Sequence, residues 1–90
     1  MALETRVGGK IAIVGGLNMD LFIQGERLPN PGETFEGNSF STGGGGKGAN
    51  QAVGVARLAR NSGTSVMIGQ VGDDSFGREL VESMDTEGID

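Results

Sequence analysis

The chain has 90 residues, of which 18 are glycine, and it contains no cysteine and no histidine. Its net charge of −5 argues against a nucleic-acid partner, which requires a basic surface, and no apolar run reaches the roughly 18 residues of a membrane span. The missing histidines remove the commonest catalytic base. The missing cysteines exclude disulfides and thiolate metal sites and fit a reducing compartment, so we expect a cytoplasmic protein.

The first segments of the chain predict a loose leader followed by a buried strand. Residues 1–9 lack the apolar stretch of a signal peptide and are expected to form the leader. Residues 10–16 are a short β-branched run that ends in two glycines, which is typical of a strand buried on both faces of a parallel sheet. Asn18 and Asp20 follow in the next turn, at the edge where open α/β sheets bind ligands.

The next segments predict a small antiparallel β flap inserted after the first strand. Residues 20–24 form a second extended piece, and residues 28–32 are a turn-rich connection that contains both prolines of the chain. Polar and apolar residues then alternate in two short pieces, 33–37 and 38–41, which is typical of strands with one wet face. We therefore expect lid strands within about residues 20–42.

The rest of the chain predicts a helix, a strand and a second helix. Small apolar residues recur at helical spacing from Lys47 to Arg60, and Gly63 is expected to end that helix. Residues 65–71 predict a second buried strand, after which residues 73–75 offer N-cap candidates for another helix. Gly88 is expected to end this second helix, and the two residues that remain would open a further strand. This order is that of an α/β sandwich.

A run of four glycines, residues 43–46, leads into Lys47 and the first predicted helix. Glycine leaves backbone N–H groups open to a small ligand, and the helix start adds free N–H groups and the positive end of its dipole. Lys47 contributes a charge and Asn50 an amide that can donate and accept. The stretch predicts a cradle for a polar or anionic small molecule, in the same crevice as Asn18 and Asp20.

Other interpretations of the glycine run are less consistent with the sequence. Gly43, Gly45 and Gly48 match the dinucleotide fingerprint, but that fingerprint requires an acidic residue about 20 positions later, where this chain has isoleucine. A Walker A loop is excluded because Gly48 stands where serine or threonine should hold magnesium. A flexible linker is disfavoured because residues 47–52 are not of low complexity. No metal site and no nucleophile–base pair can be built from the chain.

Four motifs, in order over about residues 10–90, resemble the ribokinase family of carbohydrate kinases. They are Gly-Gly-Leu-Asn-Met-Asp at 15–20, Leu-Pro-Asn-Pro-Gly-Glu-Thr at 28–34, Gly-Gly-Lys-Gly-Ala-Asn-Gln-Ala at 45–52 and Val-Gly-Asp-Asp-Ser-Phe-Gly at 71–77. The resemblance implies the start of a ribokinase-like three-layer α/β sandwich, in which the small antiparallel β insertion forms a lid. Residues 10–90 would be the N-terminal, sugar-binding part of that domain.

The resemblance also implies a function and a set of substrate-binding residues. Full-length members transfer phosphate from ATP, with magnesium, to a sugar hydroxyl, which for ribokinases is the 5-hydroxyl of D-ribose. Asn18 and Asp20 would hydrogen-bond ring hydroxyls, while Lys47 and Asn50 would complete the clamp. The lid of ribokinases is also their homodimer surface. The implied substrate-binding residues are Asn18, Met19, Asp20, Gly45, Gly46, Lys47, Gly48, Ala49 and Asn50.

The family's C-terminal ATP-binding part does not occur in these 90 residues, nor does the Gly-Ala-Gly-Asp motif that carries its catalytic aspartate. No residue here is therefore assigned to catalysis, ATP or Mg²⁺, and the chain alone is expected to be inactive. Three alternatives stay open. They are a non-catalytic module that binds a sugar or pairs through its lid with a full-length kinase, a kinase of the same family acting on another sugar or a nucleoside, and a dinucleotide-binding module.

Overall fold

The computed structural model describes residues 9–59 and 62–90. In chain order these residues form β1 (Ile11–Val14), β2 (Asn18–Gln24), β3 (Ser39–Gly45), α1 (Lys47–Leu58), β4 (Ser65–Ile68) and α2 (Ser75–Thr86). The predicted α/β order, with a hairpin between the first strand and the first helix, is confirmed. The expected leader, apart from Gly9, and the expected helix end at residues 60–61 lie outside the described residues.

The core lies on one face of the parallel pair formed by β1 and β4. Ile13 of β1 is the partner of Met67 of β4, so both side chains point to the same face of the pair. There they pack with Ala52 of α1, Met84 of α2 and Ile89. Both helices therefore cover the same side of the two strands.

The opposite face of β1 and β4 is apolar and exposed. Val14 and its partner Ile68 are 78% and 52% exposed, and neither belongs to the core cluster of the described residues. Parallel strands are usually covered by helices on both faces. The part of the chain that the structure describes thus provides two layers of an α/β sandwich.

Small side chains bring α1 close to the strands. Ala49 and Ala52 are 4% and 0% exposed, as the predicted stripe of small residues requires. Directly beneath Ala52 lies Ser65 of β4, which is fully buried and donates its hydroxyl to the Ala52 carbonyl at 2.8 Å. This bond satisfies the one buried polar side chain of the described core and ties the helix to the strand.

The boundaries of α2 follow the predicted signals. Asp74 is the N-cap, and its Oδ1 accepts a hydrogen bond from the Gly77 N–H at 2.7 Å. After α2 the chain turns at Gly88 and returns to β4. The Asp90 N–H donates to the Ser65 carbonyl at 3.1 Å, and its carbonyl accepts from Met67 N–H at 2.9 Å. Residues 89–90 form no strand, but these two bonds place Asp90 beside β4, where the further strand is expected.

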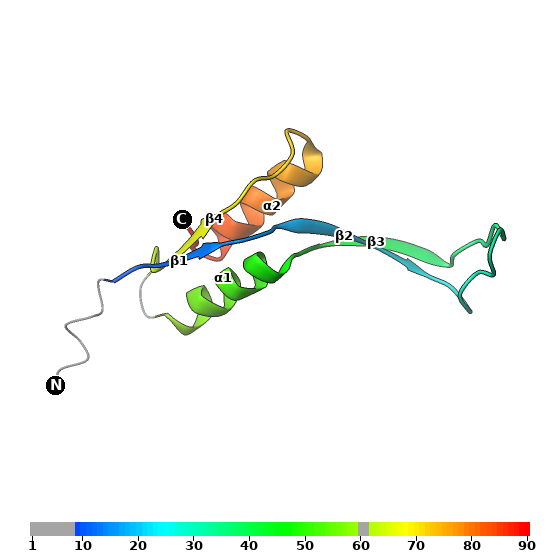
Figure 1. The fold of residues 1–90 in the computed structure, drawn as a ribbon, viewed down its shortest axis with the longest axis horizontal. Coiled ribbons are helices and arrows are strands. Elements are labelled where there is room, and N and C mark those ends of the chain that lie inside the picture. The colour runs from blue at the N-terminus through cyan, green and yellow to red at the C-terminus, as the bar shows by residue number, and fades with distance from the viewer. Residues whose placement is uncertain (1–8, 60–61) are drawn as a thin grey trace.

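The hairpin of β2 and β3 projects away from the helices and from β1 and β4 (Figure 1), and the molecule measures 62 × 29 × 19 Å. Its antiparallel register pairs Asn18 with Gly45 and Gln24 with Ser39. The strands reach further toward the helices than expected, because β2 begins at Asn18 and β3 ends at Gly45. Most of the glycine run is therefore paired strand, since backbone pairing requires no side chains.

The strand predicted at residues 33–37 is wrong, because these residues belong to the connection between β2 and β3. The Glu33 N–H donates to the Asn30 carbonyl at 2.9 Å and closes a turn. Pro31 and Gly32, whose φ is 76°, occupy the two central positions, as in a type II turn. The turn reverses the chain locally, so the polar–apolar alternation of this segment is not used for pairing.

Candidate functional site

The candidate site is built where the turn after β1 meets the first turn of α1. The Ala49 N–H donates to the Gly16 carbonyl at 3.1 Å. Gly15 and Gly48 approach so closely that a Cβ built on Gly15 would lie 3.0 Å from the Gly48 Cα. The two segments are thus packed backbone against backbone, which fixes the start of the helix beside the end of β1.

Gly46 leads into this helix with a left-handed backbone. Its φ is 102°, and a Cβ there would lie 2.5 Å from the Gly16 carbonyl oxygen, so only glycine fits. No side chain caps α1. Within residues 9–59 and 62–90, the N–H groups of Lys47 and Gly48 have no hydrogen-bond partner. Both N–H groups lie at the positive end of the helix dipole, where Lys47 is exposed and Gly48 is buried.

The hairpin places its two predicted polar residues on one face. Asn18 and Asp20 are two positions apart in β2, so their side chains point the same way, and both are exposed. The Asp20 carboxylate lies directly over Gly45, where it fills the position that a Cβ would take. Met19 points to the opposite face, on which its partner Gly44 lies beside Leu80 of α2. The structure therefore separates the Met19 side chain from those of Asn18 and Asp20.

Asn50 is exposed and lines a hollow of about 320 Å³ between α1 and α2. Asp20 is not among the residues that line it, and the lining residues Gly44 and Leu80 lie on the Met19 face of the hairpin, opposite Asp20. An ion pair of Arg57 with Glu87 lies at the hollow's border, and the hydrogen bonds from Arg57 hold the pKa of the Glu87 carboxyl below its usual range. The lining residues are Gly44, Gly45, Ala49, Asn50, Val53, Arg57, Leu80, Ser83, Met84 and Glu87.

The remaining predicted residues differ in what they offer to a ligand. Lys47 is exposed, so its ammonium group is accessible. Gly48 and Ala49 are buried, and the Ala49 N–H is already bonded to Gly16. Gly48 has only its backbone to offer a ligand, and Ala49 supports the site from within the core.

Sequence reasoning missed the partners that hold the site in place. The Gly16 carbonyl, which anchors the helix start, has no signal in the sequence because any residue has a carbonyl. Leu80 was predicted to lie in α2, but its position beside Gly44 depends on how α2 packs against the hairpin. Periodicity identifies an apolar face, and it does not identify what that face contacts.

Two features are absent from the part of the chain that the structure describes, a metal-binding group and a membrane-spanning helix. Among residues 9–59 and 62–90, no group of three or more acidic, cysteine or histidine side chains is placed to hold a metal ion. No helix within the same ranges is both long enough and apolar enough to cross a membrane.

A parallel strand pair with helices on one face, an inserted hairpin and a glycine-led helix start define the beginning of an α/β fold. The profile of the pfkB family carbohydrate kinases matches residues 9–90. The chain belongs to this family of carbohydrate kinases.

Its relatives include ribokinases, of which the chain spans about a quarter. It is 48% identical over 82 residues to the ribokinase of Schizosaccharomyces pombe, covering 88% of this chain and 26% of that protein. It is 42% identical over 79 residues to the deoxyribokinase of Salmonella typhi, covering 88% of this chain and 25% of that protein.

Solved structures agree with the fold. Thermotoga maritima ribokinase superimposes with a TM-score of 0.83 at 32% identity, covering 90% of this chain and 27% of that chain. Arabidopsis thaliana ribokinase, solved in complex with ribose and ATP, gives a TM-score of 0.76 at 34% identity, covering 91% of this chain and 26% of that chain. The predicted start of a ribokinase-like α/β fold is thereby confirmed.

Proposed function

We propose that this chain is the sugar-binding part of an ATP-dependent ribokinase, which converts D-ribose and ATP to ribose 5-phosphate and ADP. One observation carries the proposal: the Asp20 carboxylate is held over Gly45, beside the uncapped start of α1. The names of its relatives, and the ribose and ATP in the Arabidopsis complex, support the choice of reaction. ATP and Mg²⁺ would be bound by parts of the whole protein outside these 90 residues.

The proposed grip on the sugar uses complementary groups. An ionised carboxylate accepts strong hydrogen bonds, so Asp20 would take two from neighbouring ring hydroxyls, with Asn18 on the same face of the hairpin. The free N–H groups of Lys47 and Gly48 would donate to sugar oxygens, and the side chains of Lys47 and Asn50 would fix the orientation. Holding the acceptor hydroxyl in place is a large part of what phosphoryl transfer requires of a protein.

Calorimetric titration of the chain with D-ribose tests this assignment. We expect measurable binding that Asp20→Asn weakens by about tenfold or more, because hydrogen bonds to a charged acceptor are lost. Asp73→Asn is the matched control, since it removes the same charge from a fully exposed side chain before α2 and should leave ribose binding unchanged. Absence of heat with the unmodified chain, or equal losses in both variants, would contradict the proposed site.

A second candidate is a kinase of the same family for another sugar, and the deoxyribokinase relative favours it. Titration with 2-deoxyribose and with a nucleoside beside ribose separates the two, because the sugar that binds most tightly identifies the acceptor.

We also propose a partner and a location. The exposed apolar side chains along the hairpin support a homodimer formed through the lid strands, or a non-catalytic role in which the hairpin pairs with a complete kinase. The lack of cysteine in the sequence fits a reducing compartment and supports a cytoplasmic location.

A further inference from the structure

The connection between β2 and β3, residues 25–38, is far longer than the two to five or so residues that usually join a hairpin. We call this segment the hairpin tip. Long connections without helix or strand need contacts of their own to hold one shape. The tip is closed at its base, where the Asn38 N–H donates to the Gln24 carbonyl at 2.6 Å and the Ser39 hydroxyl donates to the Gln24 side chain at 3.1 Å.

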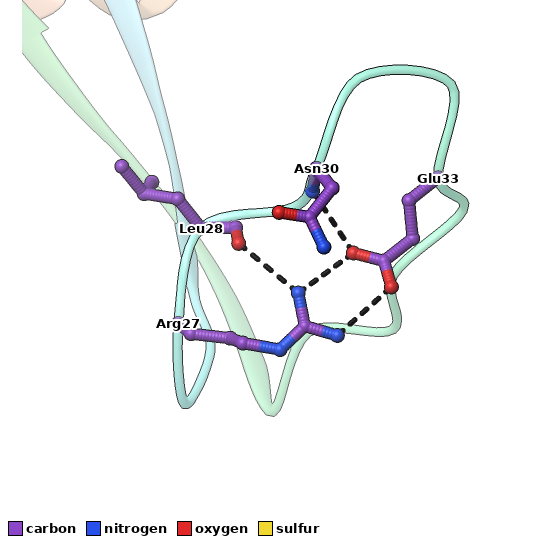
Figure 2. Close-up of polar contacts among 4 residues, drawn as sticks. All are labelled: Arg27, Leu28, Asn30 and Glu33. Carbon is purple, nitrogen blue, oxygen red and sulfur yellow. Dashed lines mark hydrogen bonds and ion pairs between the residues drawn. The ribbon is translucent and has the colours of Figure 1, made fainter.

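At the far end of the tip, Arg27 and Glu33 form a two-pronged ion pair. The Arg27 Nη1 and Nη2 atoms donate to the two carboxylate oxygens of Glu33 at 2.6 and 2.8 Å. Nη1 also donates to the Leu28 carbonyl at 3.2 Å, and the Asn30 N–H donates to Glu33 Oε1 at 2.9 Å (Figure 2). One carboxylate and one guanidinium therefore connect both sides of the Pro31–Gly32 turn.

An aromatic ring completes this cluster. The guanidinium carbon of Arg27 lies 4.4 Å from the centroid of Phe35, in a cation–π arrangement. The ring in turn lies against Gly25, where a Cβ would be 3.0 Å from Phe35 Cε1. The planar guanidinium is thus held on one side by a ring and at its edge by a carboxylate, a geometry that lysine cannot reproduce.

We propose that Arg27 and Glu33 form a clasp that folds the hairpin tip into one preformed unit. The hydrogen bonds from Arg27, and then from the Asn30 N–H, also hold the pKa of the Glu33 carboxyl below its usual range.

Amide hydrogen exchange, measured by NMR on the full 90-residue chain, tests the clasp directly. We expect the Asn30 and Glu33 amides to be protected, and Glu33→Gln to accelerate their exchange by about threefold to tenfold, as exposed charge-assisted bonds allow. Glu36→Gln is the matched control, because it removes the same charge from an exposed side chain three residues further along the same tip. Arg27→Lys keeps the positive charge but loses the planar group that donates to both carboxylate oxygens. Its acceleration of exchange should therefore lie between those of Glu33→Gln and Glu36→Gln.

Unprotected amides in the unmodified chain, or equal acceleration by Glu33→Gln and Glu36→Gln, would overturn the clasp. The measurement needs no sugar, so it separates the clasp from the proposed function. Ribose binding can fail while the tip is ordered, and the tip can be disordered while ribose still binds.

Discussion

Gly48 and Gly54 occupy the same helix but differ in what surrounds them. A Cβ on Gly48 would lie 2.9 to 3.0 Å from backbone atoms of Gly15 and Gly16, which cannot move without shifting the turn after β1. A Cβ on Gly54 would meet no atom within 4 Å. One glycine is therefore required by a close contact at the candidate site, and the other only reduces the stability of the helix.

We predict opposite effects for alanine at these two positions. Gly48→Ala should lower the free energy of unfolding by about 1–3 kcal/mol, because it overfills a packed contact. Gly54→Ala should raise it by roughly 0.5–1 kcal/mol, because alanine has the higher helix propensity. Urea unfolding followed by circular dichroism measures both, and two variants with the same sign of change would refute the contact.

Between elements, Arg57 and Glu87 join the end of α1 to the end of α2. Arg57 Nη2 and Nε donate to the two carboxylate oxygens of Glu87 at 2.6 and 3.1 Å. The pair lowers the pKa of Glu87 from its usual 4.5, so its contribution to stability is present above that pH. As the pH falls through the lowered pKa, the carboxyl takes up a proton and the contribution is lost.

This predicts a pH-dependent difference between two variants of α2. Glu87→Gln should melt below the unmodified chain at pH 7, and the gap should narrow as the pH falls below 4.5 and through the lowered pKa of Glu87. Glu82→Gln removes the same charge from an exposed side chain of α2 outside this ion pair, and it should show no such gap. Thermal melts across pH 3–7 provide the comparison, and a gap that persists in acid would disagree with the ion pair.

The order of the helices and strands was predictable because each element is marked by its own residues. Apolar periodicity marked β1, α1 and β4, and Asp74 and Gly88 marked the ends of α2. The clasp of Arg27 and Glu33 was not predictable, since two residues six positions apart meet only after the turn reverses the chain. The side of the hairpin on which Met19 lies depends on register, and the hollow beside Asn50 depends on how two helices pack. Neither is encoded in a local pattern.

For the molecule as a whole, the hairpin face opposite Asp20 is apolar. Leu21, Ile23 and Phe40 share the face opposite Asp20, and they are 57%, 71% and 63% exposed. Three exposed large side chains on adjacent strands are typical of a surface that another chain covers. This is the surface through which we propose that the homodimer forms.

Sedimentation velocity should detect that dimer and locate it. We expect Phe40→Ser to shift the chain toward monomer, because it removes an aromatic side chain from the centre of the apolar face. Leu58→Ser is the control, since Leu58 is 89% exposed at the end of α1, away from the hairpin. An unmodified chain that stays monomeric, or equal shifts in both variants, would exclude the hairpin as the interface.

The side chains that lie next to the glycine run also fix the register between β2 and β3. Sliding β3 along β2 by one position would turn every side chain of the strand to the other side, and glycines alone offer nothing to oppose the slip. Asp20 occupies the space over Gly45, and the Phe22 ring lies 3.3 Å from the Cβ position of Gly43. The positions of these two side chains therefore favour one register of β3 against β2. A one-residue insertion or deletion within β3 would therefore turn side chains such as Phe40 to the opposite face of the hairpin, while the composition of the strand stays almost unchanged.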